Sequence, residues 1–558
     1  MENLGQPSYS MEWPPPPALL TERIWVRIEQ AAAAALSEEA AAAAAICRTS
    51  AGIWRRARTA AVIPALKVMV WVCLAMSVML FAEKISMAAA VLFIKLFRCS
   101  RPRQLYQWEP LPATAAGEVD PELGCPVYPF ILVQIPMFNE REVYHLSIRA
   151  VCALTWPSDR LIIQVLDDST DKATKDLVEK ECERWREDGM NIQYISRDNR
   201  NGYKAGALRE AMEIDDVKTC DYVAIFDADH QPPSDFLLQT IPFLIHNPDL
   251  ALVQARWKFV NAYECLMTRI QEMSLNYHFK VEQESGSSTL AFFGFNGTAG
   301  VWRISAINEA KGWKDRTTVE DMDLAIRACL QGWKFVYVGE LKVKSELPST
   351  YKAYRYQQHR WACGPANLFR KTAFEIMRAK KASIWRKLYL IYNFFLARRI
   401  VSHIVTFFFY CVVIPLSCFF PEVRVPVWGV ILIPAIITLL NAASTPRSLH
   451  LMVIWIFFET VMSFHRCKAV FIGLLQAGRV NEWIVTEKLG NTPKVKAIPS
   501  ISIATKFCDR FHFMEIGVGI WLMLCAWQDF SYTRQYYYIY VFPSSIAFII
   551  MGCGYVGR

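Results

Sequence analysis

Two carboxylates separated by one residue, Asp227 and Asp229, directly follow the apolar run 222–226. If that run is a strand, both side chains can reach a common ligand where the backbone turns. Oxygen ligands of this kind suit hard cations such as Mg²⁺ and Mn²⁺, and such an ion could stabilise a leaving diphosphate. Two solvated acids in a turn are an equally simple interpretation, because the motif is short.

A second acidic pair, Asp167 and Asp168, follows the apolar run 161–166, which is typical of a strand buried on both faces. Carboxylates at such a strand end are costly to desolvate unless something pairs with them. One interpretation is that they bind the base, ribose or phosphates of a nucleotide. The other is that they cap the following helix, although Asp171 or Thr170 could do so instead.

Acidic residues also gather in the segment 318–327, where Glu320, Asp321 and Asp323 begin a predicted amphipathic helix. Negative charge is favourable at a helix N-terminus, which is one sufficient reason for their presence. A carboxylate held there also stays ionised. It could therefore act as a general base that deprotonates an acceptor hydroxyl.

The segment 356–364 combines an amide, a guanidinium and an indole. Arg360 could clamp a diphosphate, and Trp361 offers a flat apolar face to a sugar ring. Gln357 could hydrogen bond hydroxyls or phosphate oxygens. The alternative is an aromatic and basic stretch at a membrane interface, because apolar segments follow it.

The middle of the chain, residues 126–380, must position these groups. It contains strand-like apolar runs at 130–135, 161–166, 192–195, 222–226, 251–255 and 335–338. Helix-like segments at 171–186 and 203–212 separate the early runs. This alternation predicts an α/β domain with a mostly parallel, doubly wound sheet. Such sheets bind ligands beyond the carboxyl ends of their strands, where the acidic pairs lie.

Apolar segments flank this domain on both sides. The chain has 558 residues, of which 53% are hydrophobic, and its net charge is +9. The basic residues flank apolar runs, as they do at membrane surfaces, and no nucleic-acid-binding motif accompanies them. The chain is therefore predicted to be a multi-pass membrane protein that binds lipid and not nucleic acid.

The flanking parts are predicted as follows. Residues 1–60 form a tail that is partly helical and lacks a signal-peptide pattern, and residues 61–98 form one transmembrane or amphipathic helix. Residues 381–558 hold an interfacial helix, a loop and about four to six transmembrane helices. Aromatic side chains there, such as Phe394 and Phe395, could line a path for a glycan, although contact with lipid is the simpler interpretation.

Together the four groups resemble the D, D, D, QxxRW pattern of the processive glycosyltransferases of family 2. The matching residues are Asp168 in LDDST, Asp227 and Asp229 in DAD, Asp321 in VED, and Gln357, Arg360 and Trp361 in QQHRW. More narrowly, the stretches QIPMFNE (134–140), FFGFNGTAGVWR (292–303) and RVNEWIVTEKLG (479–490) resemble the plant cellulose-synthase-like proteins of subfamily A.

That resemblance implies a GT-A domain between transmembrane helices in a multi-pass protein of the Golgi membrane. It implies synthesis of β-1,4-mannan or glucomannan from GDP-mannose, with GDP-glucose as a second donor, and a requirement for Mg²⁺ or Mn²⁺. It also assigns roles on the donor side. Asp168 would hold the nucleotide, Asp227 and Asp229 the nucleotide sugar, and Asp229 the divalent ion. Lys204 would lie near the diphosphate, and Arg360 would stabilise the departing GDP.

On the acceptor side, the resemblance makes Asp321 the base that takes the proton of the acceptor's 4-hydroxyl, while the acceptor rests against Trp361. Transfer would occur with inversion, so that an α-linked donor gives a β-linked product. The segment 292–303 would face the acceptor sugar. The segment 482–488 resembles the gating loop of cellulose synthase, in which Thr486 would touch the nucleotide.

Two other functions remain open. A β-1,4-glucan synthase that builds the xyloglucan backbone from UDP-glucose is the near neighbour, because mannose and glucose differ only at C2. A membrane scaffold or transporter with an inactive GT-A domain is the non-enzyme alternative. It would predict loss of the metal-binding acids or of the base, and all of them are present. The sequence also leaves open homo- and hetero-oligomers and the side of the membrane on which the domain lies.

Overall fold

The computed structural model describes residues 27, 38–97, 102–111, 128–197, 199–476 and 511–555, without the side chains of 38–47. The chain divides into two compact units. One draws on residues 1–75, 406–430 and 512–553, and the other on residues 76–405, 431–511 and 554–558. All of the candidate site residues except Thr486, which lies outside the described residues, belong to the described part of the second unit.

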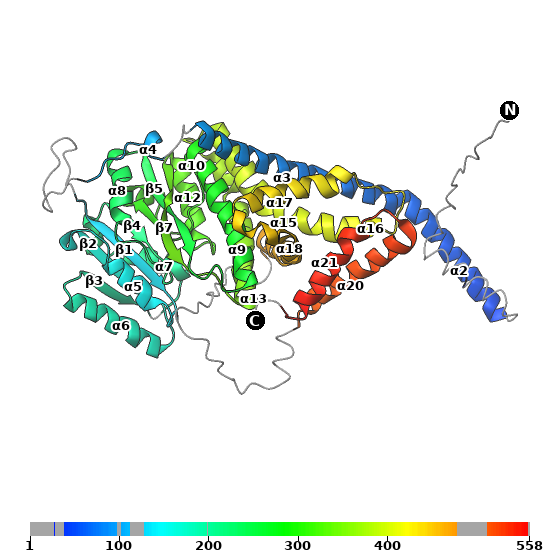
Figure 1. The fold of residues 1–558 in the computed structure, drawn as a ribbon, viewed down its shortest axis with the longest axis horizontal. Coiled ribbons are helices and arrows are strands. Elements are labelled where there is room, and N and C mark those ends of the chain that lie inside the picture. Colours follow the sequence, from blue (N-terminus) through cyan, green and yellow to red (C-terminus); the bar gives the residue numbers. More distant parts are fainter. Residues whose placement is uncertain are drawn as a thin grey trace, which may run out of the picture. The chain divides into compact units, whose positions relative to one another are not determined.

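A seven-stranded sheet forms the centre of the second unit (Figure 1). Its strands are β1 (Ile131–Met137), β2 (Leu161–Asp167), β3 (Ile192–Ser196), β4 (Tyr222–Ile225), β5 (Leu250–Phe259), β6 (Gly300–Arg303) and β7 (Lys334–Ser345). The order is β3-β2-β1-β4-β6-β5-β7, and β6 runs antiparallel to both of its neighbours. The neighbours of β1 are β2 and β4, so the strand order reverses beside β1, where such sheets bind ligands.

The predicted mostly parallel, doubly wound sheet is confirmed, and each of the six expected strands has a counterpart. Strand β6 was not predicted. It is only four residues long, so its short apolar run carries no period that distinguishes it from a loop. It matters for the site, because it holds the end of the segment 292–303 inside the sheet.

Helices cover both faces of the sheet. They include α5 (Tyr144–Cys152), α6 (Lys172–Glu187), α7 (Tyr203–Ala211), α8 (Phe236–His246), α9 (Leu266–Tyr277), α10 (Glu284–Leu290), α11 (Ile304–Glu309), α12 (Glu320–Gln331) and α13 (Tyr351–Arg378). Successive residues of β1 enter different cores, because side chains alternate along a strand. Ile131 and Val133 pack with α5, α6 and α8, whereas Leu132 packs on the face covered by α7 and α12.

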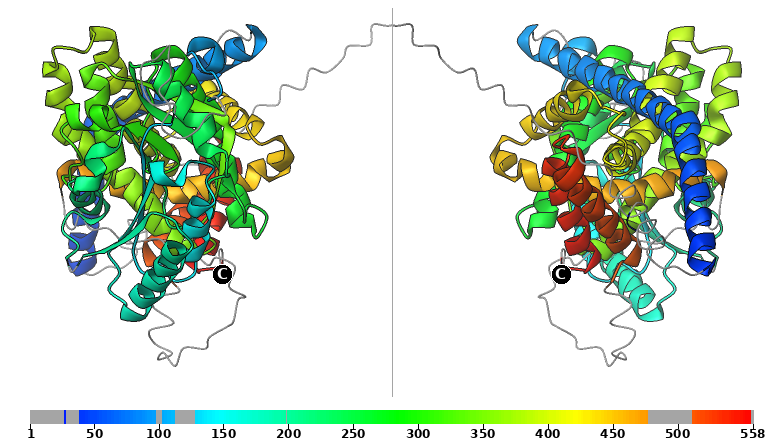
Figure 2. Two further views of the ribbon diagram at one scale, coloured as in Figure 1. Left: turned by 90° about the vertical axis from the view of Figure 1, so that its left-hand side faces the viewer. Right: turned by 90° about the vertical axis from the view of Figure 1, so that its right-hand side faces the viewer.

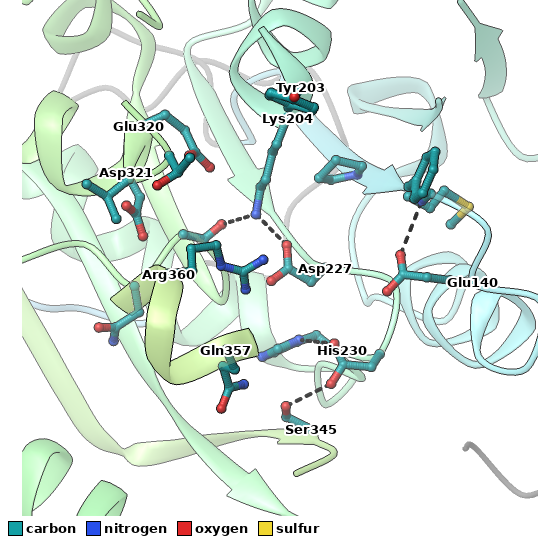
Figure 3. Close-up of a pocket in the computed structure, with 18 of the residues that line it drawn as sticks. Glu140, Tyr203, Lys204, Asp227, His230, Glu320, Asp321, Ser345, Gln357 and Arg360 are labelled. Atoms are coloured by element: carbon teal, nitrogen blue, oxygen red, sulfur yellow. Dashed lines mark hydrogen bonds and ion pairs between the residues drawn. The ribbon is translucent and has the colours of Figure 1, made fainter. Parts of the chain in front are cut away.

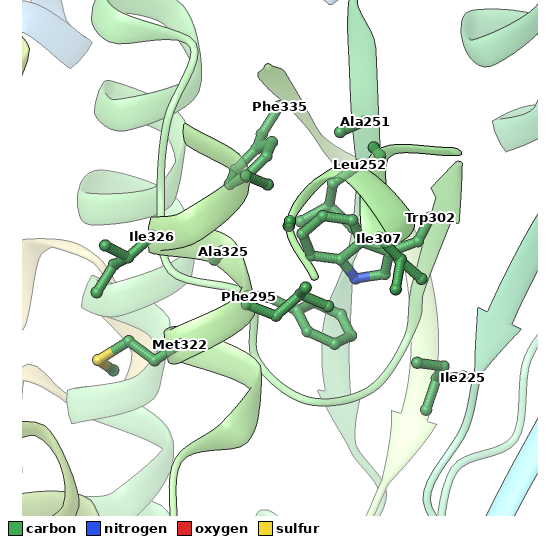
Figure 4. Close-up of a cluster of buried hydrophobic side chains, with 14 of the residues drawn as sticks. Ile225, Ala251, Leu252, Phe295, Trp302, Ile307, Met322, Ala325, Ile326 and Phe335 are labelled. Atoms are coloured by element: carbon green, nitrogen blue, oxygen red, sulfur yellow. The ribbon is translucent and has the colours of Figure 1, made fainter. Parts of the chain in front are cut away.

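Aromatic rings fill the core beneath α12 (Figure 4). The Trp302 ring of β6 lies 5.5 Å from the Phe295 ring and 5.4 Å from the Phe335 ring of β7, in edge-to-face contact. Each of these side chains is almost fully buried. Burial of this much aromatic surface ties the segment 292–303 to the sheet and thereby fixes the residues that precede β6.

Three helices within the described ranges are long and apolar enough to cross a membrane: Arg48–Phe97, Ile384–Ser417 and Pro446–Leu475. The first is continuous through α2 (Glu38–Ala57), η1 (Arg58–Val62) and α3 (Ile63–Phe97). Shorter apolar helices occupy Trp428–Ala443 and Tyr538–Gly552. The chain is thus built to associate with a membrane, while the predicted total of spans stays a prediction.

In the first unit, α20 (Phe513–Gln528) and α21 (Tyr538–Gly552) pack side by side (Figure 2). In the second unit, the π-helix η5 (Tyr389–Val401) lies within the apolar helix 384–417. The expectation that Phe394 and Phe395 line a glycan path or face lipid is wrong. Both rings are buried in the core shared with the sheet domain, and the Phe394 ring lies 5.4 Å from that of Phe292.

Candidate active site

The two acids at the carboxyl end of β2, Asp167 and Asp168, have different partners. Asp167 accepts hydrogen bonds from the backbone of Ser169, at 2.9 Å, and from the Tyr194 hydroxyl, at 3.0 Å. Asp168 receives both arms of the Arg197 guanidinium, at 2.8 and 2.5 Å. The buried carboxylate of Asp168 therefore pairs with Arg197, a residue that the sequence did not suggest.

Strand register explains this ion pair. Asp167 of β2 lies opposite Ser196 of β3, so the next residues, Asp168 and Arg197, emerge side by side at the carboxyl edge. Both side chains are only 7% exposed. Asp168 also lines a pocket at this edge of the sheet, which is the candidate active site described below. The capping interpretation holds for Asp171 instead, which accepts hydrogen bonds from the backbone at the start of α6.

The residues after β4 place two carboxylates in the same pocket. Asp227 forms an ion pair with Lys204 of α7, and its backbone nitrogen donates to Thr298 Oγ1 at 2.9 Å. Asp229 accepts from Ser345 Oγ at 3.0 Å and from the backbone of Glu346 at 3.1 Å. Asp227 is half-exposed and Asp229 is buried, so the two carboxylates of the DAD motif occupy distinct environments.

The three acids at the start of α12 separate into two functions. Asp323 is fully buried between Arg316 and Arg327, at 2.5 and 2.9 Å, and stabilises the fold. Glu320 and Asp321 instead line the pocket. Asp321 Oδ1 accepts a hydrogen bond from the backbone of Met322 at 2.7 Å, which orients the carboxylate at the helix N-terminus.

Burial changes the protonation of these two pocket acids. Burial, opposed in part by the Met322 hydrogen bond and the charge of Lys204, raises the pKa of Asp321 to about 6. Burial, together with the charge of Asp321, raises the pKa of Glu320 further, to about 8. At neutral pH the pair therefore shares a proton, which leaves one carboxylate ionised, as a general base must be.

Helix α13 carries the three QxxRW side chains into the pocket. Gln357, Arg360 and Trp361 are three and four residues apart and therefore share one face of the helix. One turn later, a Cβ at Gly364 would lie 2.6 Å from Val319 Cγ1. The absent side chain lets α13 approach the residue that precedes α12, and this close packing brings Arg360 toward Asp321 (Figure 3).

A turn before β6 completes the wall of the pocket beside Asp321. Gly297 has a φ of +79°, and a Cβ there would lie 3.0 Å from Asp321 Oδ2. Its carbonyl accepts a hydrogen bond from Lys204 Nζ at 2.9 Å, and Asn296 beside it lines the pocket. Only glycine combines this backbone conformation with so close an approach to the carboxylate.

The structure thus brings together all of the described candidate residues. Asp168, Lys204, Asp227, Asp229, Asp321, Gln357, Arg360 and Trp361 line one pocket. Lys204 and Arg360 lie among Asp227, Glu320 and Asp321 in Figure 3. Glu320 was recognised only as helix charge, and a signal existed, because it directly precedes the predicted base. The roles of the individual residues stay predictions.

The pocket suits a cation that a substrate helps to bind. In the described ranges, no three His, Cys, Asp or Glu residues are grouped so that they could hold a metal by themselves. The carboxylates of Asp227 and Asp229 are hard oxygen donors that fit Mg²⁺ or Mn²⁺. The remaining ligands would have to come from a bound molecule that is rich in oxygen, such as a diphosphate.

The sequence matches known families over the same region. Residues 132–300 match the model of glycosyl transferase family 2, and residues 222–445 match that of glycosyl transferase family group 2. Glucomannan 4-beta-mannosyltransferase 9 of Arabidopsis thaliana is 62% identical over 503 residues, which cover 90% of this chain and 93% of the relative. Glucomannan 4-beta-mannosyltransferase 1 of Oryza sativa subsp. japonica is 61% identical over 507 residues, covering 90% and 96%.

Among solved structures, a mannosyltransferase from Pyrobaculum calidifontis in complex with GDP-Man and Mn²⁺ matches with a TM-score of 0.48 and 15% identity. The match covers 73% of this chain and 100% of that chain. A likeness at this level carries no conclusion about the site.

Proposed function

This chain belongs to glycosyltransferase family 2, among its glucomannan 4-beta-mannosyltransferases, and we propose that it extends a β-1,4-linked mannan or glucomannan chain with mannose from GDP-mannose. The observation that carries the proposal is the meeting, in one pocket, of the DAD carboxylates with Asp321 and Arg360. The DAD motif suits a donor diphosphate, and an ionised buried carboxylate suits an acceptor hydroxyl.

Asp321 is the base in this proposal. Its Oδ1 is occupied by the Met322 backbone, whereas its Oδ2 faces Gly297, which has no side chain to block the approach of a hydroxyl. Asp321 removes the proton from the 4-hydroxyl at the non-reducing end of the acceptor as that oxygen attacks C1 of the donor sugar. A single displacement inverts an α-linked donor to a β-linked product and requires no covalent enzyme intermediate.

The departing GDP carries negative charge, and the pocket offers two cations for it. Burial lowers the pKa of Arg360, but Glu320, Asp227 and Asp321 oppose that change, so the guanidinium stays charged. The Lys204 ammonium is held by Asp227 and the Gly297 carbonyl, between the donor and acceptor sides. Cations that are already in place stabilise the leaving group with little reorganisation.

A divalent cation fits the donor side. Asp229, together with the donor diphosphate, would hold Mg²⁺ or Mn²⁺, which supplies neutralisation of the developing charge on the diphosphate. Asp168, fixed in place by Arg197, would hold the nucleotide, and Asp227 and Asp229 would hold the nucleotide sugar. Gln357 would hydrogen bond hydroxyl or phosphate oxygens, and Trp361 would support the acceptor sugar. By the same resemblance, Thr486, which lies outside the described residues, would touch the nucleotide.

The proposal extends to processive synthesis in the Golgi membrane, with a polysaccharide acceptor and GDP-glucose as a second donor. The three apolar helices support membrane attachment. The names of the plant relatives support a mannan or glucomannan product over a xyloglucan backbone. Assembly into homo- or hetero-oligomers is a separate question that solution measurements of mass can answer.

The test supplies membranes that contain the enzyme with radiolabelled GDP-mannose, GDP-glucose or UDP-glucose separately, and then digests the polymer. We expect a product from GDP-mannose that β-mannanase degrades, that disappears with a chelator and that returns with Mg²⁺ or Mn²⁺. Incorporation from UDP-glucose alone, into a polymer that only β-glucanase degrades, would contradict the proposal. A scaffold with an inactive domain would release no nucleoside diphosphate from any donor.

A further inference from the structure

A chain of side-chain contacts connects the membrane helix α3 with the turn beside Asp321. Lys84 Nζ of α3 pairs with Glu282 Oε1 at 2.8 Å. Glu282 Oε2 lies 2.9 Å from His278 Nδ1, and His278 Nε2 lies 3.2 Å from Asn296 Oδ1. The side chains of Lys84, Glu282 and His278 are 13%, 14% and 23% exposed, so water competes little for these contacts.

The geometry at Asn296 is that of a fixed side chain. Its Oδ1 receives a second donor, Gln283 Nε2, at 2.9 Å, and the same amide donates to the Gly294 carbonyl at 3.1 Å. His278 and Gln283 are the first and last residues of the π-helix η4 (His278–Gln283). Such short wide turns are rare and recur at functional sites. Here the wide turn brings both ends of η4 to one oxygen atom.

Fixing Asn296 also fixes the turn that follows it. Gly297 approaches Asp321 Oδ2 so closely that a Cβ would lie 3.0 Å away, and its carbonyl is bonded to Lys204. His278 does not line the pocket itself, whereas Asn296 and Gly297 do. A shift of Asn296 would therefore reach both the base and the Lys204 cation, although His278 touches neither.

The far end of the contact chain is also anchored. The Lys84 ammonium lies 4.3 Å from the centre of the Tyr277 ring, in addition to its pair with Glu282. Burial would raise the pKa of Glu282, but the Lys84 charge and the contact with His278 outweigh it and hold that pKa well below its ordinary value. Glu282 is therefore a carboxylate that can accept from both neighbours.

We propose that His278 is a positioning residue for sugar transfer: through Asn296 it holds the Gly297 turn against Asp321, and Lys84 and Glu282 hold His278 in place. This inference rests on the proposed function, because it assumes that Asp321 is the base. It predicts that the membrane helix α3 supports the reaction itself, beyond attaching the enzyme to a membrane.

Two nearly isosteric variants test the proposal. The side-chain nitrogen of glutamine can replace His278 Nε2, so His278→Gln keeps a polar contact with Asn296. Asparagine can replace only Nδ1, so His278→Asn keeps the contact with Glu282 and loses the one with Asn296. We expect His278→Gln, which loses only the contact with Glu282, to stay within about fivefold of wild-type kcat, and His278→Asn to lose about 10- to 100-fold, as misplaced catalytic groups do.

Both variants should bind GDP as the wild type does and should unfold at the same temperature in detergent, because Asp168 and the DAD motif are untouched. Equal losses in the two variants, wild-type turnover in both, or a loss confined to GDP affinity would overturn the proposal. If the wild type incorporates sugar only from UDP-glucose, the proposed donor is wrong. The same two variants are then compared with UDP-glucose, so the two failures remain distinguishable.

A double-mutant cycle tests the contribution of α3. We expect Lys84→Met to lower kcat by about fivefold in the wild-type background and to cause no further loss in His278→Asn, because residues of one network are not additive. Lys84→Arg, which can keep the ion pair, should restore most of the activity. Losses that multiply in the double variant would remove α3 from the proposal.

Discussion

In the proposed reaction the pocket has a nucleotide side and an acceptor side, and the two sides are constructed differently. On the nucleotide side, Asp168 and Arg197 follow two adjacent parallel strands, and the register of β2 and β3 is enough to pair them. On the acceptor side, Asp321 begins a helix, Gly297 belongs to a turn before β6, and Arg360 comes from α13. These three residues meet only because separate elements pack against one another.

This difference indicates where the site is easily disturbed. The Asp168–Arg197 pair is local to the sheet edge, so its loss should weaken nucleotide binding and little else. The surroundings of Asp321 depend on backbone positions in three elements, so small displacements there should reduce turnover without changing nucleotide affinity. Four measurements test this difference between the two sides of the pocket.

The largest effect is expected at the base. Asp321→Asn should reduce chain extension by about 10³-fold and leave GDP affinity unchanged, because it removes the proton acceptor and keeps the shape. Glu320→Gln is the matched control, since Glu320 lines the pocket beside Asp321 but is not the proposed base, and we expect it to cost less than about tenfold. Radiolabelled mannose incorporation and GDP binding measure the two quantities. Equal losses in both variants would remove the distinction between the two acids.

The next effect concerns the Gly297 turn. Gly297→Ala adds a Cβ 3.0 Å from Asp321 Oδ2 at a φ of +79° and should lower kcat by about 100-fold. Gly312 also has a positive φ, +65°, but a Cβ there meets nothing within 4 Å. Gly312→Ala therefore carries the backbone strain alone, about 1 kcal/mol, and should keep wild-type turnover. Similar turnover in the two variants would mean that proximity to Asp321 is irrelevant.

A smaller effect is expected on the nucleotide side. Arg197→Gln leaves the buried Asp168 carboxylate without its cation and should weaken GDP binding by about 30-fold. At saturating GDP-mannose, kcat should fall much less, which is the opposite of the Gly297 result. Arg209→Gln breaks a looser, half-exposed ion pair with Asp315, 3.5 Å long, and should change neither quantity. A kcat effect without an affinity effect would reverse the contrast.

The smallest effect is the dependence on pH. Because burial raises the pKa of Asp321 to about 6, the base is ionised above that pH and protonated below it. At saturating donor, kcat should therefore fall as the pH decreases through 6, by about tenfold per pH unit. A profile of kcat between pH 4.5 and 8 measures this. A kcat that stays level as the pH decreases from 7 to 5 would show that burial does not govern the base.

Much of the nucleotide side was predictable from the sequence. Apolar runs that end in acids indicate parallel strands with a ligand at their carboxyl edge, and Asp168, Asp227 and Asp229 lie there. Arg197 was missed although it follows the next predicted strand, because register is set by pairing and not by sequence order. The separate fates of Asp321 and Asp323 could not be predicted. The two residues lie in the same turn of α12 but point to different surroundings. Only the packing of other elements decides which of these surroundings is polar.

By itself, the sequence determined the elements and the chemical groups they carry: the order of the predicted strands, the apolar helices, and the acids and cations at their ends. These depend on local periodicity and residue type, which are readable along the chain. Only the tertiary structure decided that Arg197 neutralises Asp168, that burial raises the pKa values of Glu320 and Asp321, and that Gly297 lies against one carboxylate oxygen of Asp321. Each of these depends on desolvation and on distances between distant segments, and both arise only once the chain has packed.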